Sequence, residues 1–164
     1  ELIASLHNAD ARIENLDLNE IIVDALHAVR SNGFSDFQQT LQLEPNLPNV
    51  SANHVQIKKA LINLLRNAVE AMSSANVANS AITITVNTVA KEKLALVTIE
   101  DRGPGINPQI FHQIFDPFFT TKPSGIGMGL SISRALIEAN GGQLWVDPQS
   151  SSGAKFHFTL PFTT

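Results

Sequence analysis

The spacing of apolar residues along the chain predicts three main helices. Between residues 18 and 30, apolar side chains recur every three or four positions, and Asp17 just before them is a plausible N-cap. A longer amphipathic stretch covers residues 51–73. The third helix is expected over residues 130–140, where the pair Gly141-Gly142 is typical of a helix C-terminus.

Residues 81–101 have the period-two alternation that is typical of a β-hairpin. In the second strand Ala95, Val97 and Ile99 share one face, and Asp101 continues the same parity. Because alternate side chains of a strand lie on the same face, we expect the carboxylate of Asp101 to point towards the core. Other elements expected are strands over 39–44, 143–146 and 155–160, a short helix over 108–115 and a loop over 116–129.

Composition limits the classes of protein that this chain can represent. Its 164 residues are 43% hydrophobic and 16% charged, which predicts one globular domain. A net charge of -4 without a basic run argues against a nucleic-acid binder, and the absence of cysteine excludes disulfides, thiol catalysis and cysteine-ligated zinc. No stretch resembles a membrane helix or a signal peptide. Because helical spacing starts directly at Glu1, we expect a piece of a longer protein, with residues 1–16 as the end of a preceding helix or linker.

A polar stripe follows one face of the helix expected over residues 51–73. Lys59, Asn63, Asn67 and Glu70 are spaced by four, four and three residues. They could simply form a solvated face, but asparagine is a poor residue for a helix interior, so a pair one turn apart suggests a polar site. An amide oxygen there is a suitable ligand for Mg²⁺.

The hairpin ends in a segment suited to close contact with a ligand, Asp101-Arg102-Gly103-Pro104-Gly105-Ile106. Its glycines would let a ligand approach the backbone. A core-facing carboxylate needs a donor, and the exocyclic amine of a purine is one. An ordinary turn after a strand remains the alternative.

A glycine-rich segment, 125–130, leads directly into the third helix. Backbone amides at a helix N-terminus are a ready site for phosphate, and Lys122 just upstream could add a positive charge. The spacing matches neither a Walker A loop nor a Rossmann loop, and a flexible linker is the alternative. The adjacent aromatic segment 115–122 could serve as an anchor or as ordinary core.

Together and in this order, these segments resemble the catalytic, ATP-binding domain of bacterial sensor histidine kinases. That domain belongs to the larger family of type II topoisomerase, Hsp90 and MutL ATPases. The resemblance covers about residues 17–162. Its motifs are an N box over 63–71, a first glycine box over 101–105, an F box over 115–122 and a second glycine box over 125–130.

The resemblance implies an α/β (α+β) two-layer sandwich, in which a mixed, mostly antiparallel sheet is covered on one face by helices and an ATP lid loop closes the site. It implies ATP and Mg²⁺ as cofactors, with Asn67 as the metal ligand, Asp101 bound to the adenine amine and Lys122 on the phosphates. The implied catalytic residues are Asn63, Asn67 and Lys122. The implied nucleotide-binding residues are Asn67, Glu70, Ala71, Asp101, Gly103, Gly105, Ile106, Phe118, Thr121, Lys122, Gly125, Gly127, Met128, Gly129 and Leu130.

Asn63 separates kinase from ATPase within this resemblance. The ATPase branches carry there a glutamate that activates water, and an asparagine cannot take a proton, so transfer should need an external nucleophile. None of the histidines is followed by an acidic residue, as the acceptor histidine of such kinases normally is: His7, His27, His54, His112 and His157. We therefore expect the acceptor on a dimerisation domain outside this chain.

The domain boundaries and partners follow from this reading. Residues 1–16 would be the end of the dimerisation helix or a linker, and 17–164 the catalytic domain. The implied partners are the histidine-bearing dimerisation domain and the receiver domain of a response regulator. We expect no nucleic acid, no direct membrane contact by this piece and a cytoplasmic location, while an inner-membrane anchor on the parent stays open. The alternatives are an ATP-hydrolysing domain and a degenerate domain that only binds nucleotide.

Overall fold

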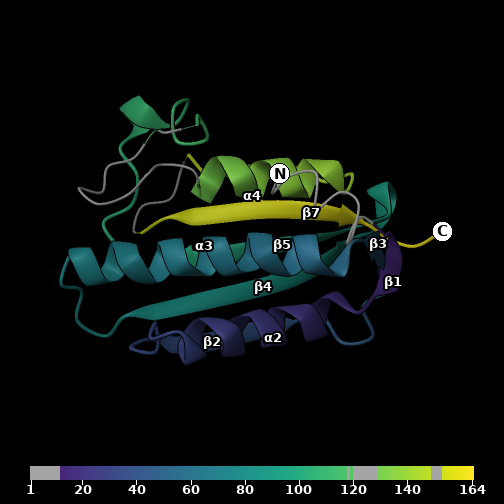
Figure 1. Cartoon of the computed structure of the whole chain (residues 1–164), viewed down its shortest axis with the longest axis horizontal. Coiled ribbons are helices and arrows are strands. Elements are labelled where there is room, and N and C mark those ends of the chain that lie inside the picture. The colour runs from purple at the N-terminus through teal and green to yellow at the C-terminus, as the bar shows by residue number, and fades with distance from the viewer. Residues whose placement is uncertain (1–11, 118, 120–128, 149–152) are drawn as a thin grey trace.

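A sheet and a layer of helices make up the chain (Figure 1). The computed structural model describes residues 12–117, 119, 129–148 and 153–164. Within them the main sheet has five strands in the order β2-β4-β5-β7-β6. Their bounds are β2 Gln38–Leu43, β4 Ala81–Val89, β5 Leu94–Asp101, β6 Leu144–Val146 and β7 Lys155–Pro161.

Most neighbours in this sheet are antiparallel, as expected. Strands β4 and β5 form the predicted hairpin through a 3-10 turn at Ala90–Glu92, and β5, β7 and β6 also pair antiparallel. Only β2 pairs in parallel with its neighbour, β4. The prediction of a mixed, mostly antiparallel sheet is therefore confirmed.

Among the described residues, three α-helices cover one face of the sheet: α2 Leu18–Ser31, α3 His54–Ser74 and α4 Gly129–Ala139. Asp17 caps α2, accepting a hydrogen bond from the backbone N–H of Glu20. The apolar stripes of these helices pack against alternate residues of β4, β5 and β7 to form the main hydrophobic core. The two-layer arrangement predicted from the sequence is confirmed.

Three expected helical stretches differ in the structure. Glu14–Leu16 is a strand, β1, which pairs antiparallel with β3 (Val50–Ala52), so helix α3 begins at His54 and not at residue 51. Asn53 has extended backbone dihedrals and caps α3, because its side chain accepts from the N–H of Gln56. Over 108–115 only Pro108–Ile110 is helical, as a 3-10 turn.

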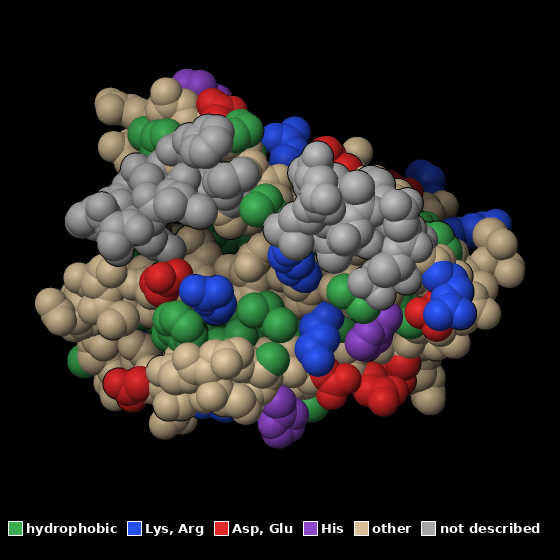
Figure 2. Space-filling view, viewed as in Figure 1, with side chains coloured by type: hydrophobic (Ala, Val, Ile, Leu, Met, Phe, Trp, Pro, Cys, Tyr) green, Lys and Arg blue, Asp and Glu red, His purple; other side chains and the backbone are tan. Residues whose placement is uncertain are grey.

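The exposed side of the helical layer carries mixed charge. In Figure 2 basic side chains gather over α3 and acidic side chains lie over α2. The sequence of α3 holds Lys58, Lys59 and Arg66 against a single acidic residue, Glu70. This locally positive helix occurs in a chain whose net charge is -4. Among the described residues, no helix combines the length and the apolar character that a bilayer crossing requires.

Candidate nucleotide site

The polar stripe predicted on α3 exists as a half-buried face. Lys59, Asn63, Asn67 and Glu70 are all of intermediate exposure, so the reading as a fully solvated face does not hold. The C-terminal part of α3 also contacts the turn that follows β5. A Cβ built on Gly103 would lie 3.5 Å from the Cβ of Ala71, and the backbone N–H of Arg102 donates to the sulfur of Met72 at 3.4 Å.

Asp101 ends β5 with its carboxylate buried, at 4% relative exposure, which confirms the expected core-facing orientation. Its Oδ1 accepts from the backbone N–H of Gly103 at 2.8 Å and from that of Ala154 at 3.1 Å. Within the described part of the chain, no hydrogen bond to Oδ2 is found. One oxygen is therefore held by the protein, and the other can accept from a ligand.

Burial raises the pKa of the Asp101 carboxyl group above its ordinary value. The hydrogen bonds from Ala154 and Gly103 oppose this shift, and the charge of the neighbouring Glu100 adds slightly to it. Burial therefore makes the charged form of this carboxyl group less favourable, and a hydrogen bond from a ligand would stabilise that form.

Three glycines near Asp101 lack a Cβ and so leave room for the neighbouring backbone and for the Asp101 carboxylate. A Cβ on Gly103 would lie 3.0 Å from Asp101 Oδ1. Gly105 has φ +80°, and its Cβ would lie 3.1 Å from the carbonyl oxygen of Gly153. Gly153 itself has φ +67°, and a Cβ there would lie 1.9 Å from the carbonyl oxygen of Asp101.

Sequence reasoning missed Gly153. It stands two residues before β7, and the only signal was a glycine just ahead of a strand, which commonly marks a turn. Its importance comes from the pairing of β5 with β7, which brings Gly153 against Asp101 from far along the chain.

Helix α4 begins at Gly129, as the glycine-rich segment predicted. Gly129 is exposed and Leu130 half-buried, while Ser133 in the first turn donates to the carbonyl oxygen of Gly129 at 2.8 Å. An exposed N-terminus of this kind offers backbone amides to an anion. The remaining predicted residues of this side lie outside the described part of the chain: Phe118, Thr121, Lys122, Gly125, Gly127 and Met128.

Phe115, the first residue of the aromatic segment, is an anchor to the core. Its ring meets Phe156 of β7 edge to face at 6.3 Å between centroids, and the guanidinium of Arg134 from α4 lies 5.3 Å from its centroid. It therefore ties the segment after β5 to both the sheet and α4. Ile106, also predicted for the site, is half-buried and packs against the core.

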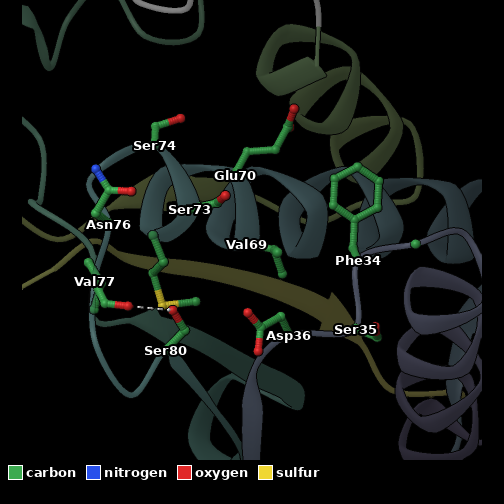
Figure 3. A pocket seen from close by; sticks show the side chains of 12 residues that line it. Phe34, Ser35, Asp36, Val69, Glu70, Ser73, Ser74, Asn76, Val77 and Ser80 are labelled. Atoms are coloured by element: carbon green, nitrogen blue, oxygen red, sulfur yellow. Dashed lines mark hydrogen bonds between the residues drawn. The ribbon is translucent and has the colours of Figure 1, made fainter.

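A separate pocket of about 630 Å³ lies on the flank of α3 that faces the connection from α2 to β2. Figure 3 shows Phe34, Ser35 and Asp36 on one wall, Glu70 and Ser73 from α3 on another, and Asn76 to Ser80 closing the far side. Glu70 thus lines this pocket, whereas Asn63, Asn67, Asp101 and the glycines around Asp101 do not. The predicted role of Glu70 towards a nucleotide stays a prediction.

A helix-covered mixed sheet, with a half-satisfied buried carboxylate at a strand end and an exposed helix start beside a polar helix face, defines a nucleotide-binding α/β sandwich. Residues 52–164 match the family model described as histidine kinase-, DNA gyrase B-, and HSP90-like ATPase. The chain belongs to this family, and it is an ATP-binding domain of the type found in sensor histidine kinases.

Relatives with sensor-kinase names support the assignment. The sensor protein FixL of Bradyrhizobium diazoefficiens is 43% identical over 124 residues, which are 76% of this chain and 24% of that protein. The sensor protein TdiS of Thauera aromatica is 34% identical over 156 residues, covering 94% and 28% of the two chains. This chain therefore spans about a quarter of the length of such relatives.

Solved structures agree with the fold. The catalytic domain of the histidine kinase ThkA superposes with a TM-score of 0.79 at 31% identity, covering 93% of this chain and 97% of that one. ThkA in complex with the response regulator protein TrrA matches with a TM-score of 0.76 at 29% identity, over 92% of this chain and 42% of that chain.

Proposed function

We propose that this chain is the Mg·ATP-binding catalytic domain of a two-component sensor histidine kinase. It transfers the γ-phosphoryl group of ATP to a histidine on a dimerisation domain, from which the group passes to an aspartate of a response regulator. The observation that carries the proposal is the carboxylate of Asp101, which is buried and, within the residues that the structure describes, bonded through Oδ1 only, beside the polar face of α3.

The positions of the described residues support the following roles. Oδ2 of Asp101 accepts from the exocyclic amine of adenine, and it would repel the carbonyl oxygen that guanine carries at the same ring position. Gly103 and Gly105 let the base approach the backbone. The exposed start of α4 at Gly129 and Leu130 supplies amides for the phosphates, and Lys122 with the glycines before α4 is proposed to complete this cradle.

Mg²⁺ is proposed to bind through Asn67. Among the described residues, no three His, Asp or Glu side chains come together to hold an ion. A single amide oxygen fits Mg²⁺ nonetheless, because this ion keeps several waters and takes its other ligands from substrate phosphates. The metal would neutralise charge on the phosphates while Asn67 sets its position.

The transfer itself needs a nucleophile from another domain. Asn63 cannot accept a proton from water, and the described His157 has both ring nitrogens engaged, with Thr98 Oγ1 at 2.9 Å and Asp147 Oδ2 at 3.3 Å. A neutral imidazole nitrogen of the acceptor attacks the γ-phosphorus, the bond to the bridging oxygen breaks, and ADP leaves. We place residues 1–16 at the end of the dimerisation helix or linker and 17–164 in the catalytic domain.

Calorimetry with Mg·ATP and Mg·GTP tests the nucleotide site. We expect ATP to be preferred, and Asp101→Asn to weaken ATP binding by about 10–100-fold, because one hydrogen bond to a charged group is lost. The matched control is Glu100→Gln, which removes a neighbouring carboxylate whose ion pair with Lys155, at 3.9 Å, is partly exposed. Equal effects of the two variants would contradict the assignment.

Incubation with γ-labelled ATP tests the reaction. The chain alone should release little phosphate and carry no label on its own histidines, and label should appear when the dimerisation domain of a close relative such as FixL is added. Steady release of phosphate by the chain alone would instead favour an ATPase. Tight binding of ATP without transfer to any added acceptor domain would favour a degenerate, nucleotide-holding domain.

A further inference from the structure

Helix α4 ends in a tightly closed turn. The N–H of Gly142 donates to the carbonyl oxygen of Ile137 at 3.0 Å and that of Gly141, with φ +81°, to the carbonyl of Glu138 at 3.1 Å. This pair of bonds is a Schellman motif, with Asn140 as the C-cap. The turn places the Asn140 side chain in the interior, at 5% relative exposure.

Asn140 joins this end of α4 to the beginning of α3. Its Oδ1 accepts from the backbone N–H of Asn53 at 2.8 Å, and its Nδ2 donates to Gln56 Oε1 at 2.9 Å and to the carbonyl oxygen of Leu136 at 2.7 Å. Asn53, the N-cap of α3, also donates through Nδ2 to the carbonyl oxygen of Arg12 at 2.8 Å. Asn53, Gln56 and Asn140 are all buried, and we call these three side chains the amide clamp.

An apolar contact would have been enough to hold two helices together. Hydrogen bonds are directional, so a buried amide network permits one axial position, whereas apolar surfaces tolerate sliding by fractions of a turn. Both amide hydrogens of Asn140 and its oxygen are used, which makes the junction fully defined at that residue.

The clamp sets how far α4 reaches along α3. The C-terminus of α4 meets the N-terminus of α3 and the two helices lie side by side, so they run antiparallel (Figure 1). At 1.5 Å per residue, Gly129 stands about 16 Å along α4 from Asn140, and Asn63 stands about 15 Å along α3 from Asn53. The first turn of α4 therefore comes level with Asn63 and within a turn of Asn67.

We propose that Asn140, acting through Gln56 and the N-cap Asn53, is a positioning residue for the phosphates of the nucleotide. It fixes the axial register between the phosphate-binding amides at the start of α4 and the metal ligand Asn67 on α3. This rests on the proposed function. The adenine side does not depend on the clamp, because Asp101 is held by β5 and β7.

The test compares adenosine, which uses the adenine side alone, with Mg·ATP, which needs both sides. In Asn140→Asp the Oδ1 acceptor remains, but an oxygen replaces Nδ2 and faces the oxygens of Gln56 and Leu136. Calorimetry should show Mg·ATP binding weakened by about tenfold or more, since small displacements in a site have large effects. Adenosine binding, followed by NMR, should stay within about twofold.

Two further variants make the result specific. Gln56→Met removes one acceptor of the clamp and should give a smaller loss of the same kind, which carries the test if Asn140→Asp does not fold. Ile137→Val shortens a fully buried side chain of α4 and destabilises the helix packing without altering a side-chain amide. It should leave the increase in affinity from adenosine to Mg·ATP unchanged.

The inference is overturned if folded Asn140→Asp, or Gln56→Met in its place, keeps the whole gain in affinity from adenosine to Mg·ATP. It is equally overturned if Ile137→Val loses as much of that gain. An unaltered chain that binds neither adenosine nor Mg·ATP would contradict the proposed function itself, and with it this inference.

Discussion

The two sides of the proposed nucleotide site are held in place over very different distances. On the adenine side, Asp101 takes both of its hydrogen bonds from backbone groups in direct contact with it, at Gly103 and Ala154. On the proposed phosphate side, we infer that the start of α4 at Gly129 is positioned by the amide clamp at the opposite end of the helix, about 16 Å away.

This difference predicts two kinds of response to substitution. Around Asp101, backbone atoms approach so closely that an added methyl group has no room, so adding a Cβ to a glycine there should act all or none. On the other side, the whole length of α4 separates the amide clamp from the backbone amides at the start of the helix. Weakening one hydrogen bond of the clamp should therefore shift these amides slightly and reduce the affinity for Mg·ATP gradually.

The largest effect is expected from Gly153→Ala. Its Cβ would lie 1.9 Å from the carbonyl oxygen of Asp101, at a residue with φ +67°, so strand β7 or the turn before it must move. We expect a loss of about 3–5 kcal/mol in the free energy of unfolding, measured by urea denaturation, together with loss of ATP binding in whatever remains folded.

Gly33→Ala is the matched control for that substitution. Gly33 also has a positive φ, +93°, but no atom lies within 4 Å of the added Cβ. Backbone strain alone should then reduce the free energy of unfolding by about 1–2 kcal/mol and leave ATP affinity unchanged. Equal losses from the two variants would show that the contact with Asp101 has no role.

An intermediate effect is expected from Asn67→Ala on the phosphate side. Removing the amide oxygen should weaken Mg·ATP binding by about tenfold and leave the affinity for ATP in EDTA almost unchanged. Calorimetry with and without Mg²⁺ measures this, and Ser73→Ala, on an exposed part of the same helix, is the control. If the affinity of Asn67→Ala still rises with Mg²⁺ as in the unaltered chain, the metal ligand lies elsewhere.

The smallest effect concerns the contribution of the Asp101 carboxyl group to the free energy of unfolding. Because burial raises the pKa of Asp101, the folded state binds a proton more readily than the unfolded state, and stability from this group is lost as pH rises through the raised pKa. At pH values above the raised pKa, Asp101→Asn should therefore melt a few degrees higher than the unaltered chain, because each kcal/mol is worth roughly 2–4 °C in a domain of this size.

The same pKa shift predicts how this gain depends on pH. The difference in melting temperature should shrink as the pH falls through the raised pKa, because the Asp101 carboxyl group is then neutral as well. Calorimetric scans between pH 4 and 8, with Glu100→Gln beside them, measure the effect. A gain that stays constant over that range would mean that the charge of Asp101 is not its source.

Much of the fold could be predicted from local periodicity. The helical spacing indicated α2, α3 and α4 within a few residues, and the alternation from 81 to 101 indicated the hairpin and the inward carboxylate of Asp101. Periodicity succeeds there because each of these segments is long and has one buried face, so the side chains themselves report which face that is.

Short segments were predicted less well for a physical reason. Glu14–Leu16 was expected to belong to the end of a helix or to a linker, and it is a strand. Three residues carry too little periodicity, and their conformation depends on pairing with Val50–Ala52. The same pairing delayed the start of α3 to His54. The helix predicted over 108–115 forms only as a 3-10 turn, because the apolar side chains there pack against the core one by one and do not form a continuous helical face.

The sequence by itself determined which chemical groups this protein carries: the asparagines of α3, the carboxylate at the end of β5 and the glycines before α4. The tertiary structure alone decided which groups meet. The contact of Gly153 with Asp101 and the amide clamp between Asn140 and Asn53 join residues more than fifty positions apart, at distances that depend on how strands and helices pack. No local pattern encodes such contacts, because Gly153 and Asn140 look in the sequence like any turn glycine or helix-capping residue. Their roles depend on the residues that the fold brings beside them.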